Sequence, residues 1–166
     1  MSMIRVKVCP SVCLSAETGF TLLELLIVVA ILGLAAALAV PNYLQWNARY
    51  QLRQATTELQ SHLSLARMAA MNQNTTVIVT PTVSGGQLSA TFTNPSGGRV
   101  MPPFSETIRE VTAVAGGPVQ FNSLGLRIGG GTGIQIMTLT NRNGLTYSIG
   151  ITPGGKVRWC ASATCV

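Results

Sequence analysis

Residues 19–40 read Gly-Phe-Thr-Leu-Leu-Glu-Leu-Leu-Ile-Val-Val-Ala-Ile-Leu-Gly-Leu-Ala-Ala-Ala-Leu-Ala-Val, and this stretch decides the fold. The apolar run that follows Gly19 holds a single charge, Glu24. As a helix, residues 20–40 would be about 32 Å long, and the hydrocarbon core of a bilayer is about 30 Å thick. The run therefore predicts a transmembrane and assembly helix over residues 20–40.

The order of the N-terminal features excludes an ordinary secretory signal peptide. Such a peptide has a short apolar region followed by a small-residue cleavage site, whereas here the small residue, Gly19, precedes the apolar run. A cut after Gly19 would give Phe20 a free amino group four residues from Glu24. That amine could neutralise the carboxylate, within one chain or between neighbours. A plain signal anchor with a chance glutamate is the alternative.

Residues 19–24, Gly-Phe-Thr-Leu-Leu-Glu, resemble the prepilin signature of type IV pilins and type II secretion pseudopilins. The resemblance implies that a prepilin peptidase cuts after Gly19 and methylates Phe20, and that Glu24 steers subunit register during assembly. It also implies that residues 1–19 are a cytoplasmic leader. Gly33 and Pro41 match positions where related filaments locally lose helix, which we state as a hypothesis.

Beyond Pro41, apolar residues recur every three or four positions, a helical pattern. This pattern predicts that residues 41–74 are the head-proximal half of one long helix, ending near residues 72–74 because Asn tolerates a left-handed C-terminal position. His62 lies beside the apolar stripe and is interpreted as a half-buried packing residue. The stripe consists of Leu44, Ala48, Leu52, Ala55, Leu59, Leu63, Ala66 and Ala70.

From residue 75 the pattern becomes that of short strands between Gly-, Pro- and Asn-rich turns. Strands are expected at 75–83, 88–93, 107–114, 119–122, 124–128, 134–140, 145–151 and 156–160, with an Asn-Gly hairpin turn at 141–144. Residues 75–166 are therefore expected to form a β-rich globular head. The predicted fold class is α+β, a pilin fold in which one long N-terminal helix packs on an antiparallel sheet.

The head most resembles the GspH/FimT-type branch of the pseudopilin family. Three segments carry the resemblance: the prepilin signature, the helix end at residues 66–71, and the turn Pro-Gly-Gly-Lys-Val-Arg at 153–158. The sequence contains no phosphate-binding Gly-rich loop leading into a helix and no Gly-x-Ser-x-Gly. Glu106 is interpreted as solvated. We expect no enzyme activity, no cofactor and no metal site.

The C-terminal segment carries two further predictions. Cys160 and Cys165 are expected to form a disulfide in an oxidising periplasm, the alternative being free or mispaired thiols. Lys156 and Arg158 match a Gly-Arg-x-Arg motif that some DNA-binding minor pilins of this branch carry, with Lys in place of the first Arg. Arg142, on the preceding hairpin turn, could join them. The alternative is that they are charges protecting an edge strand.

These features favour a structural subunit, a minor pseudopilin of a type II secretion or type IV pilus machine. A DNA-binding minor pilin for DNA uptake is the alternative. The implied partners are other pilins or pseudopilins, the prepilin peptidase, an inner-membrane assembly platform, the lipid bilayer and, for the alternative, DNA. The expected location is the bacterial inner membrane, crossed once with the head in the periplasm, and then the filament. The charged share, 10% of residues, is low for a soluble domain and agrees with this placement.

Overall fold

The computed structural model describes residues 20–107 and 111–165, with the side chains of residues 38–41 left aside. The chain divides into two compact units, Met1–Pro41 and Asn42–Val166. One helix, α1 (Leu22–Asn72), supplies the described helical residues of the first unit and opens the second. The leader predicted for residues 1–19, including Gly19, lies outside the described residues.

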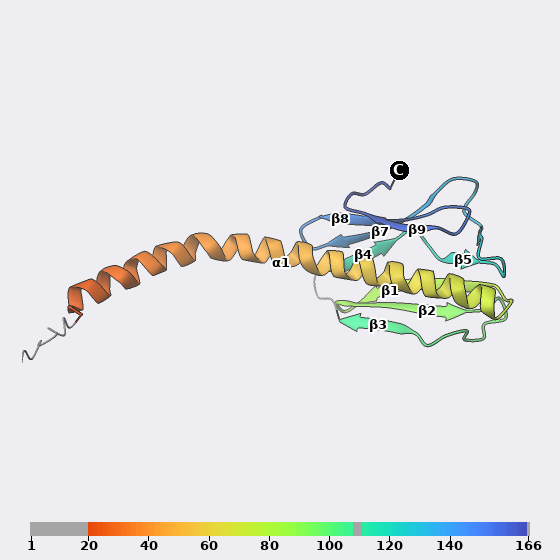
Figure 1. The fold of residues 1–166 in the computed structure, drawn as a ribbon, viewed down its shortest axis with the longest axis horizontal. Helices are drawn as coiled ribbons and strands as arrows, with labels where there is room; N and C mark the ends of the chain where they lie inside the picture. Colours follow the sequence, from red (N-terminus) through yellow and green to blue (C-terminus); the bar gives the residue numbers. More distant parts are fainter. Residues whose placement is uncertain (1–19, 108–110, 166) are drawn as a thin grey trace, which may run out of the picture. The chain divides into compact units, whose positions relative to one another are not determined.

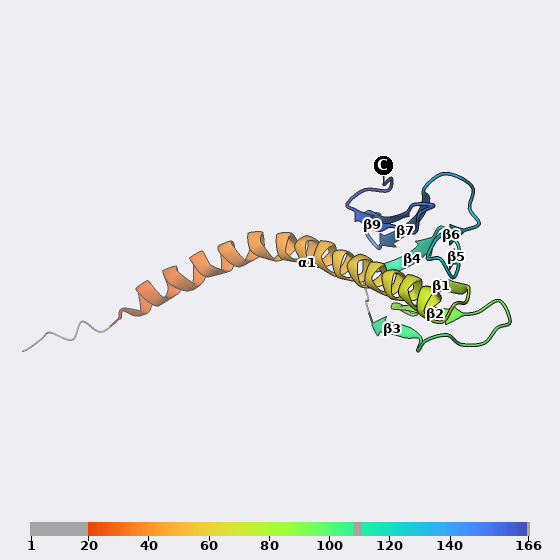
Figure 2. The same cartoon turned by 45° about the vertical axis from the view of Figure 1, so that its right-hand side comes forward.

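The second unit packs residues 42–72 of α1 against two antiparallel sheets (Figures 1 and 2). The five-stranded sheet has the order β3-β2-β1-β5-β6, and the four-stranded sheet has the order β4-β7-β8-β9. The strands are β1 (Val77–Ser84), β2 (Gln87–Thr93), β3 (Phe104–Thr107), β4 (Val111–Ala115), β5 (Val119–Phe121), β6 (Arg127–Ile128), β7 (Gln135–Asn141), β8 (Thr146–Ile151) and β9 (Val157–Cys160). The protein is therefore α+β, as the sequence predicts.

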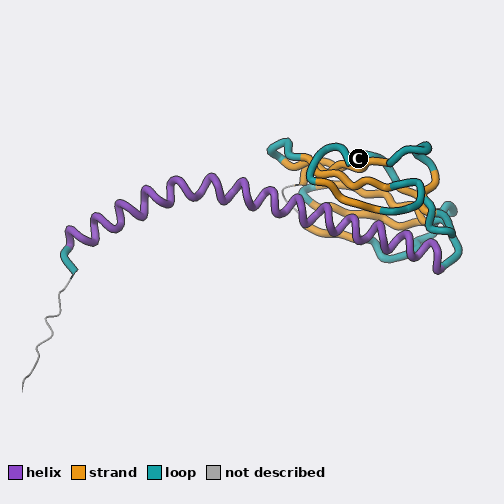
Figure 3. Tube along the Cα trace, turned by 45° about the horizontal axis from the view of Figure 1, so that its top comes forward, coloured by secondary structure: helices purple, strands orange, loops and turns teal. Residues whose placement is uncertain are grey.

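The core lies between the helix and the sheets (Figure 3). The apolar stripe on the helix is buried from Ala48 to Ala70, because its spacing keeps these residues on one face of α1. Leu44, which the sequence places in the same stripe, is exposed. The facing strands contribute their inward residues to the core: Val77, Val79, Phe92, Phe121, Met137, Leu139, Ile149 and Ile151.

The helix ends where the sequence predicts. Asn74 adopts a left-handed conformation with φ 49°, and the amide of Thr75 donates to the carbonyl of Ala70 at 3.1 Å. This geometry satisfies a carbonyl that would otherwise lack a partner at the helix end. His62 is half-buried, and its ring packs on Phe104 with 4.2 Å between the ring centroids, which confirms its interpretation as a packing residue.

Two strand predictions are wrong in detail. The single strand expected at 107–114 is divided between the sheets, because Phe104 of β3 pairs with Ala90 whereas Val111 of β4 pairs with Asn141. The strand expected at 124–128 is only two residues long. Residues 122–125 form a turn instead, in which the side-chain oxygen of Asn122 accepts from the amides of Leu124 and Leu126.

Candidate functional site

The N-terminal unit presents an apolar surface. Every side chain of residues 20–37 is exposed, and Phe20 is 75% exposed. Thr21 lies just before α1, and its hydroxyl accepts from the amide of Glu24 at 3.1 Å, which caps the helix. Glu24 is the acidic residue of the first turn, where the partial positive charge of the helix end favours an anion. A surface this apolar needs lipid or another helix to cover it.

Gly33 and Pro41 are the other residues that the sequence selects in this unit. An added Cβ at Gly33 would have nothing within 4 Å. The backbone is helical through Pro41, whose side chain lies outside the description. Within the described residues no single helix is long and apolar enough to cross a membrane. One bent pair, Leu22–Ala37 with Asn42–Asn72, meets the length and composition criteria together.

The basic residues of the C-terminal segment lie in two separate places. Lys156 and Arg158 are both exposed, on the turn into β9 and on β9 itself, the edge strand of the four-stranded sheet. Arg142 is exposed in the turn between β7 and β8. Gly150 near one end of β8 pairs with Arg158, whereas Arg142 precedes the other end of β8. At about 3.3 Å per residue the two arginines are separated by roughly 20 Å, so the structure does not bring Arg142 to this pair.

Arg67 of α1 fixes the turn that carries Lys156. Its guanidinium donates to the carbonyl of Gly125 at 2.9 Å and to the carbonyl of Gly154 at 3.2 Å. Gly155 is buried beneath this contact with φ 76°, and a Cβ there would overlap the carbonyl oxygen of Gly125. The helix end and the Pro-Gly-Gly-Lys turn, two of the segments that carry the family resemblance, are therefore in direct contact.

Cys160 and Cys165 form a disulfide, with 5.6 Å between their Cα atoms. Cys165 is buried because the chain after β9 folds back over Gly150 of β8. A Cβ on Gly150 would lie 2.9 Å from the Cβ of Cys165, so only glycine leaves room for this return. The disulfide fixes the chain end on the face of the sheet, next to the basic edge strand.

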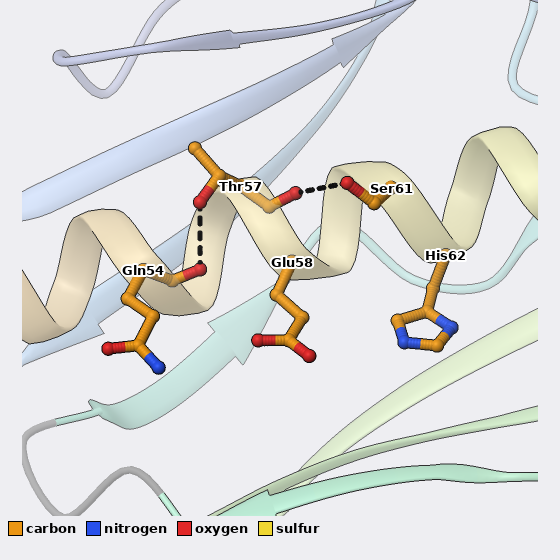
Figure 4. A pocket seen from close by; sticks show the side chains of 5 residues that line it. All are labelled: Gln54, Thr57, Glu58, Ser61 and His62. Atoms are coloured by element: carbon orange, nitrogen blue, oxygen red, sulfur yellow. Dashed lines mark hydrogen bonds between the residues drawn. The ribbon is translucent and has the colours of Figure 1, made fainter.

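The side of α1 opposite Arg67 carries a polar hollow that the sequence does not predict. Residues of α1 line it, among them Gln54, Glu58 and His62 (Figure 4). Gln54 donates to Glu106 of β3 at 2.8 Å. A hydrogen bond with the Glu58 carboxyl, burial and the negative charge of Glu58 together raise the pKa of Glu106 to about 7, although the hydrogen bond from Gln54 lowers it.

The interpretation of Glu106 as solvated is therefore wrong. Its carboxyl is half-buried beside Glu58, and its pKa is raised because two neighbouring carboxylates cannot both ionise easily. A sequence signal for this pair was lacking, because Glu58 and Glu106 are far apart in the chain and meet only through packing. Among the described residues no group of three His, Cys, Asp or Glu side chains is placed to hold a metal ion.

An exposed apolar helix with one glutamate in its first turn and a small α+β head are the features of pilin-like subunits. The chain belongs to the type II transport protein GspH family, whose model matches residues 55–155, more than half of the chain. A model of the prokaryotic N-terminal methylation motif matches residues 14–40. This family consists of structural subunits rather than enzymes. The motif and the pilin relatives described below mark the chain as a membrane-anchored, pilus-associated protein.

Curated relatives include a fimbrial protein of Pseudomonas aeruginosa, 39% identical over 80 residues, or 48% of this chain and 51% of the relative. The type IV major pilin protein PilA of Myxococcus xanthus (strain DK1622) is 51% identical over 43 residues, 26% of this chain and 20% of that protein. The chain thus spans about half the length, or less, of these relatives. Among solved structures, the type IV minor pilin FimU of Pseudomonas aeruginosa matches 66% of this chain and 88% of its own, with 17% identity and a TM-score of 0.49.

Proposed function

We propose that this chain is a minor pseudopilin, a structural subunit of a type II secretion pseudopilus or a type IV pilus that assembles through its N-terminal helix. The observation that carries the proposal is the exposed apolar surface of residues 20–37 within a chain of the GspH family. Its partners are other pilins or pseudopilins, the bilayer that holds residues 20–40 before assembly, and an inner-membrane assembly platform. The head, residues 75–166, lies in the periplasm.

Processing creates the group that makes assembly specific. A prepilin peptidase cuts after Gly19 and methylates the new N-terminal amine of Phe20. A carboxylate at the centre of a membrane helix costs about 2.5–3.5 kcal/mol, and less near the end where Glu24 lies. The amine four residues away, or the amine of a neighbouring subunit, offsets that cost. Pairing with a neighbour fixes the register of one subunit against the next.

Mass spectrometry of the native protein tests the processing. The expected result is a chain that begins at N-methylated Phe20. Glu24→Gln should leave this cleavage unchanged and reduce incorporation of the subunit into the filament, because only the charge is lost. An intact leader on the native protein would refute the proposed processing. Full incorporation of Glu24→Gln would refute the role of Glu24.

Gly33 and Pro41 are proposed as the positions where α1 loses helix on assembly. Gly33 has no side chain to pack, and Pro41 lacks the amide that an interior helical hydrogen bond needs. Hydrogen exchange of the assembled filament should show weak protection near residues 33–41. Strong protection through that segment would contradict the proposal.

A second candidate function is DNA capture, favoured by the exposure of both Lys156, on the turn into β9, and Arg158 on β9. Such a small pair would bind phosphates without reading bases, and its affinity would fall steeply with salt. Arg142, about 20 Å away by strand length, would contact a separate phosphate on the same duplex. The opposing explanation is that the two cations protect the edge of β9 from pairing with another strand.

Fluorescence anisotropy with the unit Asn42–Val166 and labelled duplex DNA separates the two explanations. If the pair captures DNA, Lys156→Ala with Arg158→Ala should weaken binding at least about tenfold at low salt, since each lost phosphate contact removes a counterion-release contribution. Arg99→Ala is a matched control, because Arg99 is also exposed but lies outside the four-stranded sheet. Equal effects of the two changes would exclude specific capture by this turn.

A further inference from the structure

Three aromatic side chains form an exposed stripe on α1, just after the apolar run. Tyr43, Trp46 and Tyr50 are 63%, 61% and 56% exposed, although Tyr and Trp are usually packed against other groups. The ring centroids of Tyr43 and Trp46 are 6.3 Å apart, and those of Trp46 and Tyr50 are 5.7 Å apart with the rings stacked. Their spacing of three and four residues places them on one face of the helix.

This face is not used by the head. The residues of the same segment that pack on the sheets, Ala48 and Leu52, belong to the buried stripe and are 5% and 0% exposed. On a helix with 100° between residues, Trp46 lies well over 90° away from both. The described residues of the head therefore leave the aromatic stripe exposed.

We propose that the stripe of Tyr43, Trp46 and Tyr50 docks in the headgroup layer of the membrane and sets the depth at which the subunit sits before assembly. This inference rests on the proposed function, because it needs residues 20–40 to be in the bilayer. Trp and Tyr concentrate at membrane–water interfaces, where the ring is partly in an apolar layer and its N–H or O–H reaches water.

Chain length supports this position. Tyr43 lies three positions after Val40, the end of the apolar run, which is about 5 Å of helix. The headgroup layer is roughly 5–8 Å thick on each side of the hydrocarbon core. Side chains on a helix lean toward its N-terminus, so the Trp46 ring covers the turn before its own Cα and falls within this layer. Tyr50, one helical turn further along α1, stacks on the Trp46 ring.

Charge and residue size favour lipid over a second helix as the occupant. Residues 42–57 contain Arg49 and Arg53 and no acidic residue, which suits anionic headgroups. Helices that pack closely in a membrane use small residues at the contact. The chain provides such residues earlier, at Gly33 and the three alanines of residues 35–37, all exposed. Bulky aromatic rings would hold two helices apart.

Fluorescence quenching by brominated lipid tests the inference on the full chain. The chain has two tryptophans, so the Trp159→Phe variant makes Trp46 the single emitter. It is reconstituted in vesicles of phosphatidylethanolamine and phosphatidylglycerol. The lipid is brominated either near the headgroup or near the end of the acyl chain. We expect a blue-shifted emission and at least about twofold greater quenching by the shallow bromine. The matched control, Trp46→Phe, retains Trp159 in the head and should be insensitive to both lipids.

Flotation of the vesicles separates the two proposals. If the protein fails to float with the vesicles, both the membrane anchoring and this inference are overturned. If it floats and Trp46 is unquenched, or is quenched equally by the deep bromine, the anchoring stands and the interfacial stripe is refuted. A blue shift that depends on protein concentration and not on bromine would show that a second copy covers the stripe, which also refutes lipid docking.

Discussion

Replacing Gly155 by alanine should destabilise the head far more than the same change at the preceding glycine. Gly155 has φ 76°, and its Cβ would overlap the carbonyl oxygen of Gly125 and lie 2.8 Å from Nε of Arg67. At Gly154 the φ angle is not positive, and the nearest neighbour of a Cβ would be Oγ1 of Thr152 at 3.9 Å. Of these two adjacent glycines in one turn, Gly154 should tolerate replacement by alanine and Gly155 should not.

The magnitude follows from two contributions. A non-glycine residue in the left-handed region costs about 1–2 kcal/mol. The overlap with Gly125 is with backbone, so the turn must move and at least one hydrogen bond of Arg67 must break, which costs about 1.5–3 kcal/mol for a charged donor. The free energy of unfolding should therefore fall by about 3–5 kcal/mol for Gly155→Ala, whereas Gly154→Ala should change it by less than about 0.5 kcal/mol.

Urea unfolding of the unit Asn42–Val166, followed by near-ultraviolet circular dichroism, measures both variants under identical conditions. The two tryptophan-containing regions give independent signals, because Trp159 is half-buried against the head core and Trp46 lies on the exposed helix face. The unfolding slope should be unchanged, which shows that the difference is in stability. Equal midpoints for the two variants would refute the proposed contact between Arg67, Gly125 and Gly155.

Three further predictions concern other parts of the chain. Cys160→Ser with Cys165→Ser should lower the free energy of unfolding by about 2 kcal/mol, the chain-entropy estimate for so short a loop, and reductant should reproduce that loss in the native chain. The pKa of Glu106 is raised in the folded state, so the folded protein binds the Glu106 proton more tightly than the unfolded chain does. Stability should therefore fall as pH rises from about 4.5 to about 7, and Glu106→Gln should flatten that part of a pH series of melting curves. Leu124→Ser, at an exposed turn position, should leave the melting temperature within about 2 °C of the native value; a larger drop would show that this side chain packs on the head.

Periodicity predicted the elements that depend on local pattern. The helical stripe identified the buried face of α1, and Asn74 takes the left-handed position that ends the helix. Most strands were anticipated because each is bounded by turn residues with a specific conformational requirement. The sequence could not show that residues 107–114 serve two sheets, since strand propensity does not specify the partner strand.

The parts of the candidate site that depend on local pattern were predictable from the sequence. The parts that depend on which segments pack together were not. Lys156 just before β9 and Arg158 on β9 are two residues apart in the chain, so their common exposure follows from local geometry. Arg142 was placed with them by its nearness in sequence, and the length of β8 separates them. The pairing of Glu58 with Glu106 depends on how β3 packs beside α1, which no local pattern encodes.

The contact of Arg67 joins two segments of this chain that carry the family resemblance and lie far apart in sequence. The guanidinium holds the carbonyls of Gly125 and Gly154, and the bend at Gly155 then presents Lys156 to solvent. A change at Arg67 would displace the basic turn as well as destabilise the head, so it could not separate DNA capture from folding. Substitution of the exposed side chain of Lys156 leaves that backbone contact intact. Only such a change can show whether the turn binds a ligand or merely completes the fold.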